Sequence, residues 1–317
     1  MHKQIIKSHL EMHPVALVRR VSPGFASAQR QHGEGPPLDV LAAEEEHDSM
    51  VKLSRELMAE RSPMGRIVEL PGDASQPDCS FIEDCVVPLP GLGFFVCSLH
   101  PSRQGEVGPV AEAAASERWR ECGRADPMLG ECIEGGDVLT VLSEDKRYHF
   151  FVGVGNRSNV KGCNALRRAL SKSLGYSIDI TEDEPVRFLV HEVSLGGTGW
   201  LHLKSAVTHV RGAGFLASGA DCMVLSRMRE CLGEEDATTL RQQMEDPCVV
   251  PKHATNALTL PGGAVLAHPD AVGAIKGRLP ENNRSHIHGV ASPELARADG
   301  ALTCGVLVLD TSCKWVK

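Results

Sequence analysis

The sequence predicts a single repetitive α/β domain. Two or three apolar runs of strand length precede each helical segment, and this order recurs about four or five times over the 317 residues. Short strands that alternate with helices in this way are typical of ββαβ-like units, and recurrence of such a unit favours one repetitive domain. No break in composition and no linker interrupts the pattern between residues 1 and 317. We therefore expect one domain rather than two.

Composition and charge argue against several classes of protein. The formal net charge of −8 at pH 7 disfavours a nucleic-acid-binding surface and permits a cationic small ligand. No run of 18 apolar residues occurs, so we expect no transmembrane helix and no membrane partner. The first 20 residues mix charged and apolar side chains and lack the apolar core of a signal peptide.

The cysteines and histidines also limit the possibilities. The 11 cysteines are an odd number without a Cys-x-x-Cys pair, which suits free thiols in a reducing compartment, so we expect a cytoplasmic protein. The same spacing argues against a structural zinc site. His9 and His13 have the spacing of a metalloprotease motif, but Leu10 stands where that motif has Glu.

Hydrophobic periodicity places the elements of the first half of the chain. Its strand-length runs are apolar and end at Pro, Gly or Asn. Its helical segments are longer, and leucines recur on them at i, i+4 spacing, as Leu166 and Leu170 do. Residues 22–37 are rich in Gly, Ser, Gln and Pro and are predicted to form a long loop. The predicted strands are 14–21, 66–70, 93–97 and 148–154, and the predicted helices are 38–64, 108–120 and 160–174.

The second half is predicted to contain more short strands. Residues 200–205 alternate apolar and polar side chains, the period of a half-buried strand, and residues 223–244 have a helical pattern. Near the end, an Asp-Gly turn at residues 299–300 leads through Cys304 into the apolar run 306–309. The other predicted strands are 175–180, 188–193, 214–217, 256–260, 263–268 and 287–290.

Three carboxylates gather in residues 77–87, around a strand-like run. Asp78 precedes the run, and Glu83 and Asp84 are adjacent within it. In an extended chain Glu83 and Asp84 point to opposite faces, whereas a kink or bulge lets both face one ligand. The stretch is therefore either a polar turn before a strand or a pocket for a cation, because paired carboxylates can grip a guanidinium group.

Three further charged residues lie beside predicted strands. Arg103 follows the strand at 93–97, and Arg157 follows the strand at 148–154, where binding residues collect. Glu134 precedes Gly135 and Gly136, and paired glycines permit a tight turn with close backbone approach. Taken singly, each arginine is read first as a solvated side chain. The glycine pair alone is read first as a plain turn.

His202 and Cys304 are the two candidates for catalytic chemistry. His202 shares one face of the predicted strand 200–205 with Lys204, a position that also suits a structural histidine. Cys304 lies where a loop becomes a buried strand, and most cysteines in such places are small core residues. Whether Cys304 is a nucleophile depends on a base, an orienting carboxylate and a substrate pocket elsewhere in the chain.

Taken together, these stretches resemble the dimethylarginine dimethylaminohydrolase family. Each motif is weak alone, but six occur in the family's order between about residues 14 and 310. The motifs are Pro-Asp-Cys with Phe-Ile-Glu-Asp at 77–84, Pro-Ser-Arg at 101–103, Gly-Gly-Asp-Val-Leu at 135–139, Phe-Phe-Val-Gly with Arg-Ser-Asn at 150–159, Leu-His-Leu-Lys-Ser at 201–205 and Asp-Gly-Ala-Leu-Thr-Cys at 299–304.

The resemblance implies a fold and a set of catalytic roles. The fold is the five-bladed α/β propeller of the guanidine-modifying superfamily, which also holds arginine deiminases and amidinotransferases, with the site on the central axis. By the family's pattern Cys304 is the nucleophile, His202 is general acid and then general base, and Glu134 orients the imidazole. Arginine metabolism and nitric oxide regulation are the implied biological setting.

The resemblance also implies which residues bind substrate. Glu83 and Asp84 match the positions that hold the guanidinium, Asp78 the one that meets the α-amine, and Ala298 one whose backbone touches the substrate. Arg103 and Arg157 match the two that bind the α-carboxylate. The implied substrate is a methylated arginine, converted to citrulline without a metal or organic cofactor, by a monomer or homodimer. An arginine deiminase-like hydrolase and a catalytically silent relative that binds or regulates stay open as alternatives.

The chain departs from the family in three places. Residues of about 178–198 are longer than in the mammalian enzymes and flank His202, so they are read as an insertion that alters a lid or an oligomer contact. Residues 24–35 match the substrate-closing lid in place but align poorly. Gly305 stands where the mammalian enzyme has a second cysteine, and we expect no loss of activity from that change.

Overall fold

Five three-stranded sheets of one common design make up the described part of the chain. The computed structural model describes residues 13–30, 35–174, 187–219, 222–233 and 238–310. In every sheet the middle strand is antiparallel to one neighbour and parallel to the other. Antiparallel neighbours can be joined by a hairpin, whereas parallel neighbours need a longer crossover, here one that contains helix. The chain thus repeats a ββαβ unit.

Each sheet is built from three strands. In chain order their strands are β15 (Val306–Leu309), β1 (Val15–Arg19) and β2 (Arg66–Leu70); β3 (Val86–Leu89), β4 (Gly93–Val96) and β5 (Glu121–Arg124); β6 (Val138–Leu142), β7 (Arg147–Val154) and β8 (Arg187–Ser194); β9 (Val207–Val210), β10 (Gly214–Ala217) and β11 (Cys248–Val249); and β12 (Ala257–Thr259), β13 (Val265–Ala267) and β14 (Ile287–Gly289).

The helices stand mainly in the crossovers between parallel strands. They are α2 (Val40–Arg61), α3 (Val107–Ser116), α4 (Val160–Leu174), the pair α6 (Cys222–Glu230) and α7 (Thr238–Glu245), and α8 (Pro269–Arg278), with the short α5 (Leu203–Ala206) before β9 and α9 (Pro293–Arg297) before β15. None of the helices within the described residues is long and apolar enough to cross a membrane.

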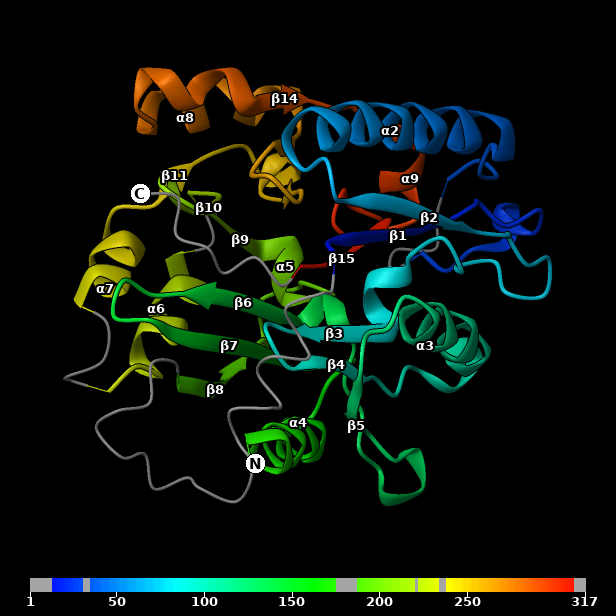
Figure 1. Ribbon diagram of the computed structural model, residues 1–317, viewed down its shortest axis with the longest axis horizontal. Helices are drawn as coiled ribbons and strands as arrows, with labels where there is room; N and C mark the ends of the chain where they lie inside the picture. Colours follow the sequence, from blue (N-terminus) through cyan, green and yellow to red (C-terminus); the bar gives the residue numbers. More distant parts are fainter. Residues whose placement is uncertain (1–12, 31–34, 175–186, 220–221, 234–237, 311–317) are drawn as a thin grey trace. The chain divides into compact units, whose positions relative to one another are not determined.

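Contacts group the described residues into two compact units. The first unit extends to Arg124 and includes Leu260–Ala264 and the chain from Ser292 onward; it holds the first two sheets. Its first sheet is closed by the last strand, because β1 pairs with β15 from Val15↔Leu309 to Val18↔Val306. The helix α2 packs against β2 and α9 in this unit (Figure 1). Asp39 caps α2, since its carboxylate accepts hydrogen bonds from the Leu41 and Ala42 amides.

The second unit comprises Ala125–Thr259 and Val265–Ala291 and holds the other three sheets. Its largest sheet is β6–β7–β8, in which β7 and β8 pair in parallel along all eight residues, from Arg147↔Arg187 to Val154↔Ser194. One apolar core lies under α6 and α7, around Phe151, Phe215 and Met228. A second core, which includes Ile275 of α8, packs on the β12–β13–β14 sheet.

Most predicted elements are confirmed, and two predictions are wrong. The helix α4 has the predicted bounds, whereas the helix expected over 223–244 is two helices, α6 and α7. The strand expected over 200–205 does not form, because Leu203–Ala206 is the helix α5. The short strands β5, β9 and β11 were not predicted.

Two predicted segments are described only in part. The strand predicted at 175–180 lies outside the described residues, and β8 occupies 187–194 of the stretch read as an insertion. Of the candidate lid loop at 24–35, Phe25–Ser27 forms a 3-10 helix, η2, and residues 31–34 lie outside the described part of the chain.

Candidate active site

Cys304 lies in the turn that precedes β15 in the first unit. Its side chain is buried, with 7% of the residue exposed, and it packs with Phe25, Phe81 and Ala298. Within the turn, the Cys304 amide donates to the Ala301 carbonyl at 3.0 Å. The loop-to-strand position predicted for Cys304 is confirmed. A closed turn followed at once by a paired strand fixes the direction of the thiol.

Glu83 is bonded to the Cys304 turn by two hydrogen bonds. The Glu83 amide donates to the Cys304 carbonyl at 3.1 Å, and the Thr303 hydroxyl donates to Glu83 Oε2 at 2.7 Å. Glu83 and Asp84 are both buried in a 3-10 helix, η3 (Ile82–Cys85), rather than in the extended chain considered above. The Glu83 carboxylate thus lies against Thr303, the residue before Cys304.

Asp78 precedes η3 and contacts the candidate lid loop. Its Oδ1 accepts a hydrogen bond from the Gln29 amide at 3.0 Å, and 6% of the residue is exposed. The Gln29 side-chain amide in turn donates to the Ser102 hydroxyl at 2.7 Å. Asp78 is therefore positioned by the segment that the resemblance reads as a lid.

Arg103 is held by two buried carboxylates. Its Nη1 donates to Asp84 Oδ2 at 2.8 Å and its Nη2 to Glu106 Oε2 at 2.8 Å, while a weaker bond of 3.3 Å reaches the Phe81 carbonyl. All three ionisable residues are at most 5% exposed. In this state Arg103 therefore binds protein carboxylates through both terminal nitrogens, and a substrate carboxylate would have to compete with them.

Glu106 was not identified from the sequence. Burial raises the pKa of Glu106 to about 7, and the neighbouring Arg103 guanidinium opposes that rise. Asp78 and Asp84 raise the pKa further, because each adds a nearby negative charge. The spacing of Arg103 and Glu106, i and i+3, was the available signal, but it does not reveal that Asp84 faces the same guanidinium.

Ala298 and the following Asp-Gly turn are shaped by close packing. Ala298 caps the end of α9 and is 3% exposed, and Asp299 has a φ of 58°. A Cβ at Gly300 would lie 2.4 Å from the Phe81 ring. Glycine is therefore required at Gly300, because any side chain would displace Phe81.

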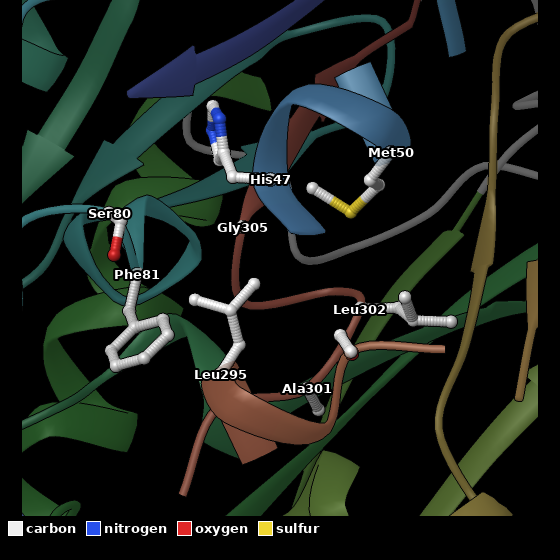
Figure 2. A pocket seen from close by; sticks show the side chains of 9 residues that line it. His47, Met50, Ser80, Phe81, Leu295, Ala301, Leu302 and Gly305 are labelled. Carbon is white, nitrogen blue, oxygen red and sulfur yellow. The ribbon is translucent and has the colours of Figure 1, made fainter. Parts of the chain in front are cut away.

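A narrow apolar pocket lies behind the Cys304 turn. Figure 2 shows Met50 and His47 of α2 on one side of it and Leu295 of α9 on another, with Gly305 in the wall. A Cβ at Gly305 would lie 3.1 Å from Met50 Cε. A second cysteine at this position would press on Met50, which accounts for the glycine in physical terms.

In the second unit, His202 and Glu134 form a buried pair. His202 Nε2 lies 2.8 Å from Glu134 Oε2, so the imidazole donates to the carboxylate. Glu134 is fully buried and His202 is 5% exposed. His202 is extended, with φ −130° and ψ 155°, and immediately precedes α5. This is the contact expected between an orienting carboxylate and a catalytic imidazole.

Arg157 faces the same carboxylate from another direction. Arg157 Nη1 lies 3.7 Å from Glu134 Oε1, an ion-pair distance that is too long for a hydrogen bond. About 15% of the Arg157 side chain is exposed. The Arg157 side chain therefore has more access to solvent than that of Arg103, which is 6% exposed.

Asp137 is a second carboxylate beneath His202 that the sequence did not single out. Its Oδ1 accepts from the Leu203 amide at 3.0 Å and its Oδ2 from the Ser158 hydroxyl at 2.6 Å. The Ser158 hydroxyl accepts in turn from the Glu134 amide at 3.0 Å. Asp137 is thus linked to Glu134 through the Ser158 hydroxyl and to His202 through the amide of its neighbour Leu203.

Burial raises the pKa of Asp137 to about 6, and the nearby His202 and the Ser158 hydroxyl oppose that rise. Room for this carboxylate depends on Gly153 of β7, where a Cβ would lie 2.8 Å from Asp137 Oδ1. The Gly-Gly-Asp motif at 135–137 was the available sequence signal for Asp137.

Each unit therefore assembles part of the residue set named from the sequence. The first unit carries Asp78, Glu83, Asp84, Arg103, Ala298 and Cys304, and the second unit carries Glu134, Arg157 and His202. The additional residues that join these sets are Thr303 and Glu106 in the first unit and Asp137 and Ser158 in the second. No disulfide joins the cysteines whose side chains the structure describes.

Comparison with known proteins gives the fold class. No model of a known protein family matches the chain. A serine variant of the dimethylarginine dimethylaminohydrolase of Pseudomonas aeruginosa, complexed with citrulline, is 18% identical over 94% of this chain and 100% of that one, with a TM-score of 0.66. A dimethylarginine dimethylaminohydrolase adduct with S-methyl-L-thiocitrulline is 20% identical over the same shares, with a TM-score of 0.67.

A third solved structure comes from an enzyme with a different activity. The N-terminal domain of ArgZ, a cyanobacterial arginine dihydrolase bound to substrate, is 12% identical over 93% of this chain and 98% of that one, with a TM-score of 0.65. Together with the five ββαβ units, these similarities confirm the prediction of a five-bladed α/β propeller fold.

Proposed function

We propose that this chain is a hydrolase of arginine derivatives that converts N-ω-methylated arginines to citrulline and dimethylamine or methylamine. One observation carries the proposal. The two residue clusters that the sequence assigned to one reaction, Cys304 with Glu83 and His202 with Glu134, are each assembled in a fold shared with dimethylarginine dimethylaminohydrolases. The Glu83 amide lies 3.1 Å from the Cys304 carbonyl, and His202 Nε2 lies 2.8 Å from Glu134 Oε2. Both are distances of direct hydrogen bonds.

The proposed reaction has two stages. The Cys304 thiolate attacks the guanidinium carbon and forms a C–S bond, which gives a tetrahedral intermediate. His202 then protonates the departing amine, the C–N bond breaks, and a thiouronium joined to Cys304 remains. Water, deprotonated by His202, attacks the same carbon, the C–S bond breaks, and citrulline leaves. Glu134 holds the imidazole through Nε2 and stabilises its cationic form.

Binding of the guanidinium is assigned to Glu83 and Asp84. A guanidinium carbon is a poor electrophile unless the cation is gripped and oriented, which is the task of buried carboxylates. Glu83 is well suited because it is bonded to the Cys304 turn itself. Asp84 already accepts from Arg103 through one oxygen, so its part in binding is coupled to that arginine.

Binding of the amino-acid end is assigned to Asp78, Ala298, Arg103 and Arg157. Of the two arginines, Arg157 is the stronger candidate for the α-carboxylate, because its side chain is 15% exposed, against 6% for that of Arg103. Arg103 is more deeply buried and makes bonds of 2.8 Å to two carboxylates. We therefore assign to Arg103 the orientation of Asp84 in addition to any contact with substrate.

The second candidate function is hydrolysis of arginine itself. The observation in its favour is the similarity to the ArgZ domain, whose TM-score of 0.65 nearly equals the 0.66 and 0.67 of the dimethylarginine dimethylaminohydrolases. Both candidates use the same nucleophile, base and carboxylates. The two candidates differ in whether the pocket accommodates methyl groups on the guanidinium of the substrate.

The deciding experiment measures citrulline formed from asymmetric dimethylarginine, monomethylarginine and arginine by the full-length protein. We expect the highest kcat/KM with a methylated substrate and none with Cys304→Ser. The matched control is Cys122→Ser, since Cys122 is also 7% exposed but lies in β5 and bonds to the Leu92 carbonyl. Highest kcat/KM with arginine would favour the second candidate, and no citrulline from any substrate would favour a silent binding relative.

A further inference from the structure

Two histidines and an aspartate of the second unit meet at a site that the proposed reaction does not use. His253 lies in a 3-10 helix, η7 (Lys252–Ala254), His268 directly precedes α8, and Asp270 is in the first turn of α8. His253 Nε2 is 2.8 Å from Asp270 Oδ2, and His268 Nδ1 is 3.7 Å from the same oxygen. One donor atom from each residue lies within 4.8 Å of the other two.

Local structure already fixes the three side chains. His268 is the N-cap of α8, and its Nδ1 accepts a hydrogen bond from the Asp270 amide at 3.2 Å. The His253 and His268 rings pack edge to face, with centroids 4.6 Å apart and an interplanar angle of 80°. Because an ordered donor set loses little freedom when an ion enters, this arrangement favours binding.

Lys252, the positively charged residue nearest to the cluster in the sequence, packs on an aromatic ring. The ammonium group of Lys252, which precedes His253, lies 4.5 Å from the centre of the Trp200 ring. The donor side chains are open to solvent, with 59% of His253, 55% of Asp270 and 32% of His268 exposed. An ion can therefore reach the cluster without any opening of the fold.

A matched site in the first unit shows what is particular to this cluster. His100 is followed by Pro101 and caps the 3-10 helix η4 (Pro101–Glu106) through Nδ1, as His268 is followed by Pro269 and caps α8. The place of Asp270 is taken by Ser102. Among the described residues, no group of three metal-ligating side chains includes His100. The second imidazole and the carboxylate are thus additions to an ordinary capping histidine.

We propose that His253, His268 and Asp270 bind one divalent transition-metal ion, such as zinc, and leave a fourth coordination position to water. Two imidazole nitrogens and one carboxylate oxygen form a donor set that suits such ions. Bonds of about 2.0 to 2.1 Å in tetrahedral geometry place donor atoms about 3.3 Å apart. The observed 2.8 and 3.7 Å bracket that separation, so small side-chain rotations complete the site. Because His268 Nδ1 has a single lone pair, the ion replaces the Asp270 amide as its partner.

The protonation of the cluster is compatible with this assignment. A histidine must be neutral to coordinate a metal. His253 donates to Asp270 from Nε2 when no ion is present, since the carboxylate can only accept. Entry of an ion therefore moves the proton of the neutral His253 ring to Nδ1.

An ion at this position would tie η7 to the start of α8. The helix α8 packs against η7, β11 and β14, so the ion would stabilise the part of the second unit built on the β12–β13–β14 sheet. His253 and His268 are 15 positions apart and match no common ligand spacing. Only the fold brings them together.

The test is a titration of full-length protein, freed of metal by a chelator, with Co²⁺ and then with competing Zn²⁺. We expect one saturable equivalent with visible d–d absorption and without the near-ultraviolet thiolate-to-cobalt band. His253→Ala, Asp270→Asn and His268→Asn should each weaken this binding at least about 10-fold, the loss seen even for outer-sphere partners of a metal. Zn²⁺ should raise the Tm of the parent but not of the three variants.

The matched control is His100→Asn, which changes the equivalent cap and should leave binding unchanged. Asn at position 268 retains a helix-capping side chain, so His268→Asn separates loss of the ligand from loss of the cap. Metal-free circular dichroism checks that each variant is folded. Equal binding by parent and variants, a spectrum carried by the thiolate band, or no saturable binding at millimolar Co²⁺ would each overturn the proposal.

Discussion

Two buried carboxylates, Glu106 in the first unit and Asp137 in the second, are balanced in different ways. In the first unit the Arg103 guanidinium lies between Asp84 and Glu106, so charge is balanced mainly by charge. In the second unit Asp137 is buried between neutral donors, the Ser158 hydroxyl and the Leu203 amide. Removal of Arg103 leaves buried carboxylates without their cation, whereas Asp137 is sensitive to added bulk beside it. This difference predicts which substitutions damage stability and which damage catalysis.

The largest effect should come from removing either of the two reactive groups. Cys304→Ala and His202→Ala should each lower kcat by about 10³-fold or more, and the double variant should be no worse than the poorer single one. Groups that act in one step are not additive, so this result would unite the two clusters in one reaction. Single-turnover assays of citrulline formation check it, and a double variant that loses the product of both factors would contradict it.

Arg103→Ala should cause the largest loss of stability. It leaves the Asp84 and Glu106 carboxylates buried without their cation, and breaking a buried pair costs about 3 to 5 kcal/mol. The control is Arg124→Ala, whose ion pair with Glu121 is largely exposed and worth about 0 to 1 kcal/mol. Urea unfolding of both variants measures the difference. Similar losses in the two would show that the Arg103 network is not the stabilising element.

Glu106→Gln should flatten the pH dependence of stability. The pKa of Glu106 is about 7 in the folded protein against the ordinary 4.5, so the folded state holds its proton more tightly. The stabilisation this gives is complete below about pH 4.5 and is lost as the pH rises to about 7. At about 1.4 kcal/mol per pKa unit, it amounts to about 3 kcal/mol.

The measurement is the free energy of unfolding of the parent and of Glu106→Gln between pH 4.5 and 8. Glutamine mimics the protonated carboxyl, so the variant should gain on the parent as the pH rises through this window. Parallel curves would mean that Glu106 does not titrate there.

Crowding in the second unit should have the smallest of these effects. A Cβ at Gly153 would lie 2.8 Å from Asp137 Oδ1 and 2.8 Å from Leu195 Cδ1, so Gly153→Ala should cost about 1 to 3 kcal/mol. Because Asp137 positions the Leu203 amide next to His202, kcat should fall more than KM rises. Gly196→Ala is the control, with its nearest atom 3.6 Å away. Equal losses in the two variants would rule out crowding as the cause.

The sequence predicted the repeat and most of its elements because each depends on local periodicity. Residues 160–174 illustrate this success, since α4 has the predicted bounds. Residues 200–205 illustrate the limit: their alternation reads as a strand, but the Leu203 amide bonds to Asp137 and starts a helix. That bond joins residues 66 positions apart, which no local pattern reveals.

The same limit applies to the candidate site. Cys304, His202 and the carboxylates were named through a resemblance in their motifs, whereas Glu106 and Asp137 act through contacts made only in the folded chain. The spacing of Arg103 and Glu106 is visible in the sequence, but their meeting with Asp84 is not. Motif analysis therefore reached the residues that the resemblance names, and it missed Glu106 and Asp137.

The pairing of β1 with β15 has a consequence for biosynthesis. Val15 leaves the ribosome early, but its antiparallel partner Leu309 follows only after nearly all of the described chain. Until then, one edge of a strand whose five residues are all buried in the finished protein stays open to other nascent chains. Sheets made of consecutive strands, such as β6–β7–β8, face no such delay. The sheet that carries the Cys304 turn is thus completed last, so a polypeptide that stalls before β15 cannot close this sheet.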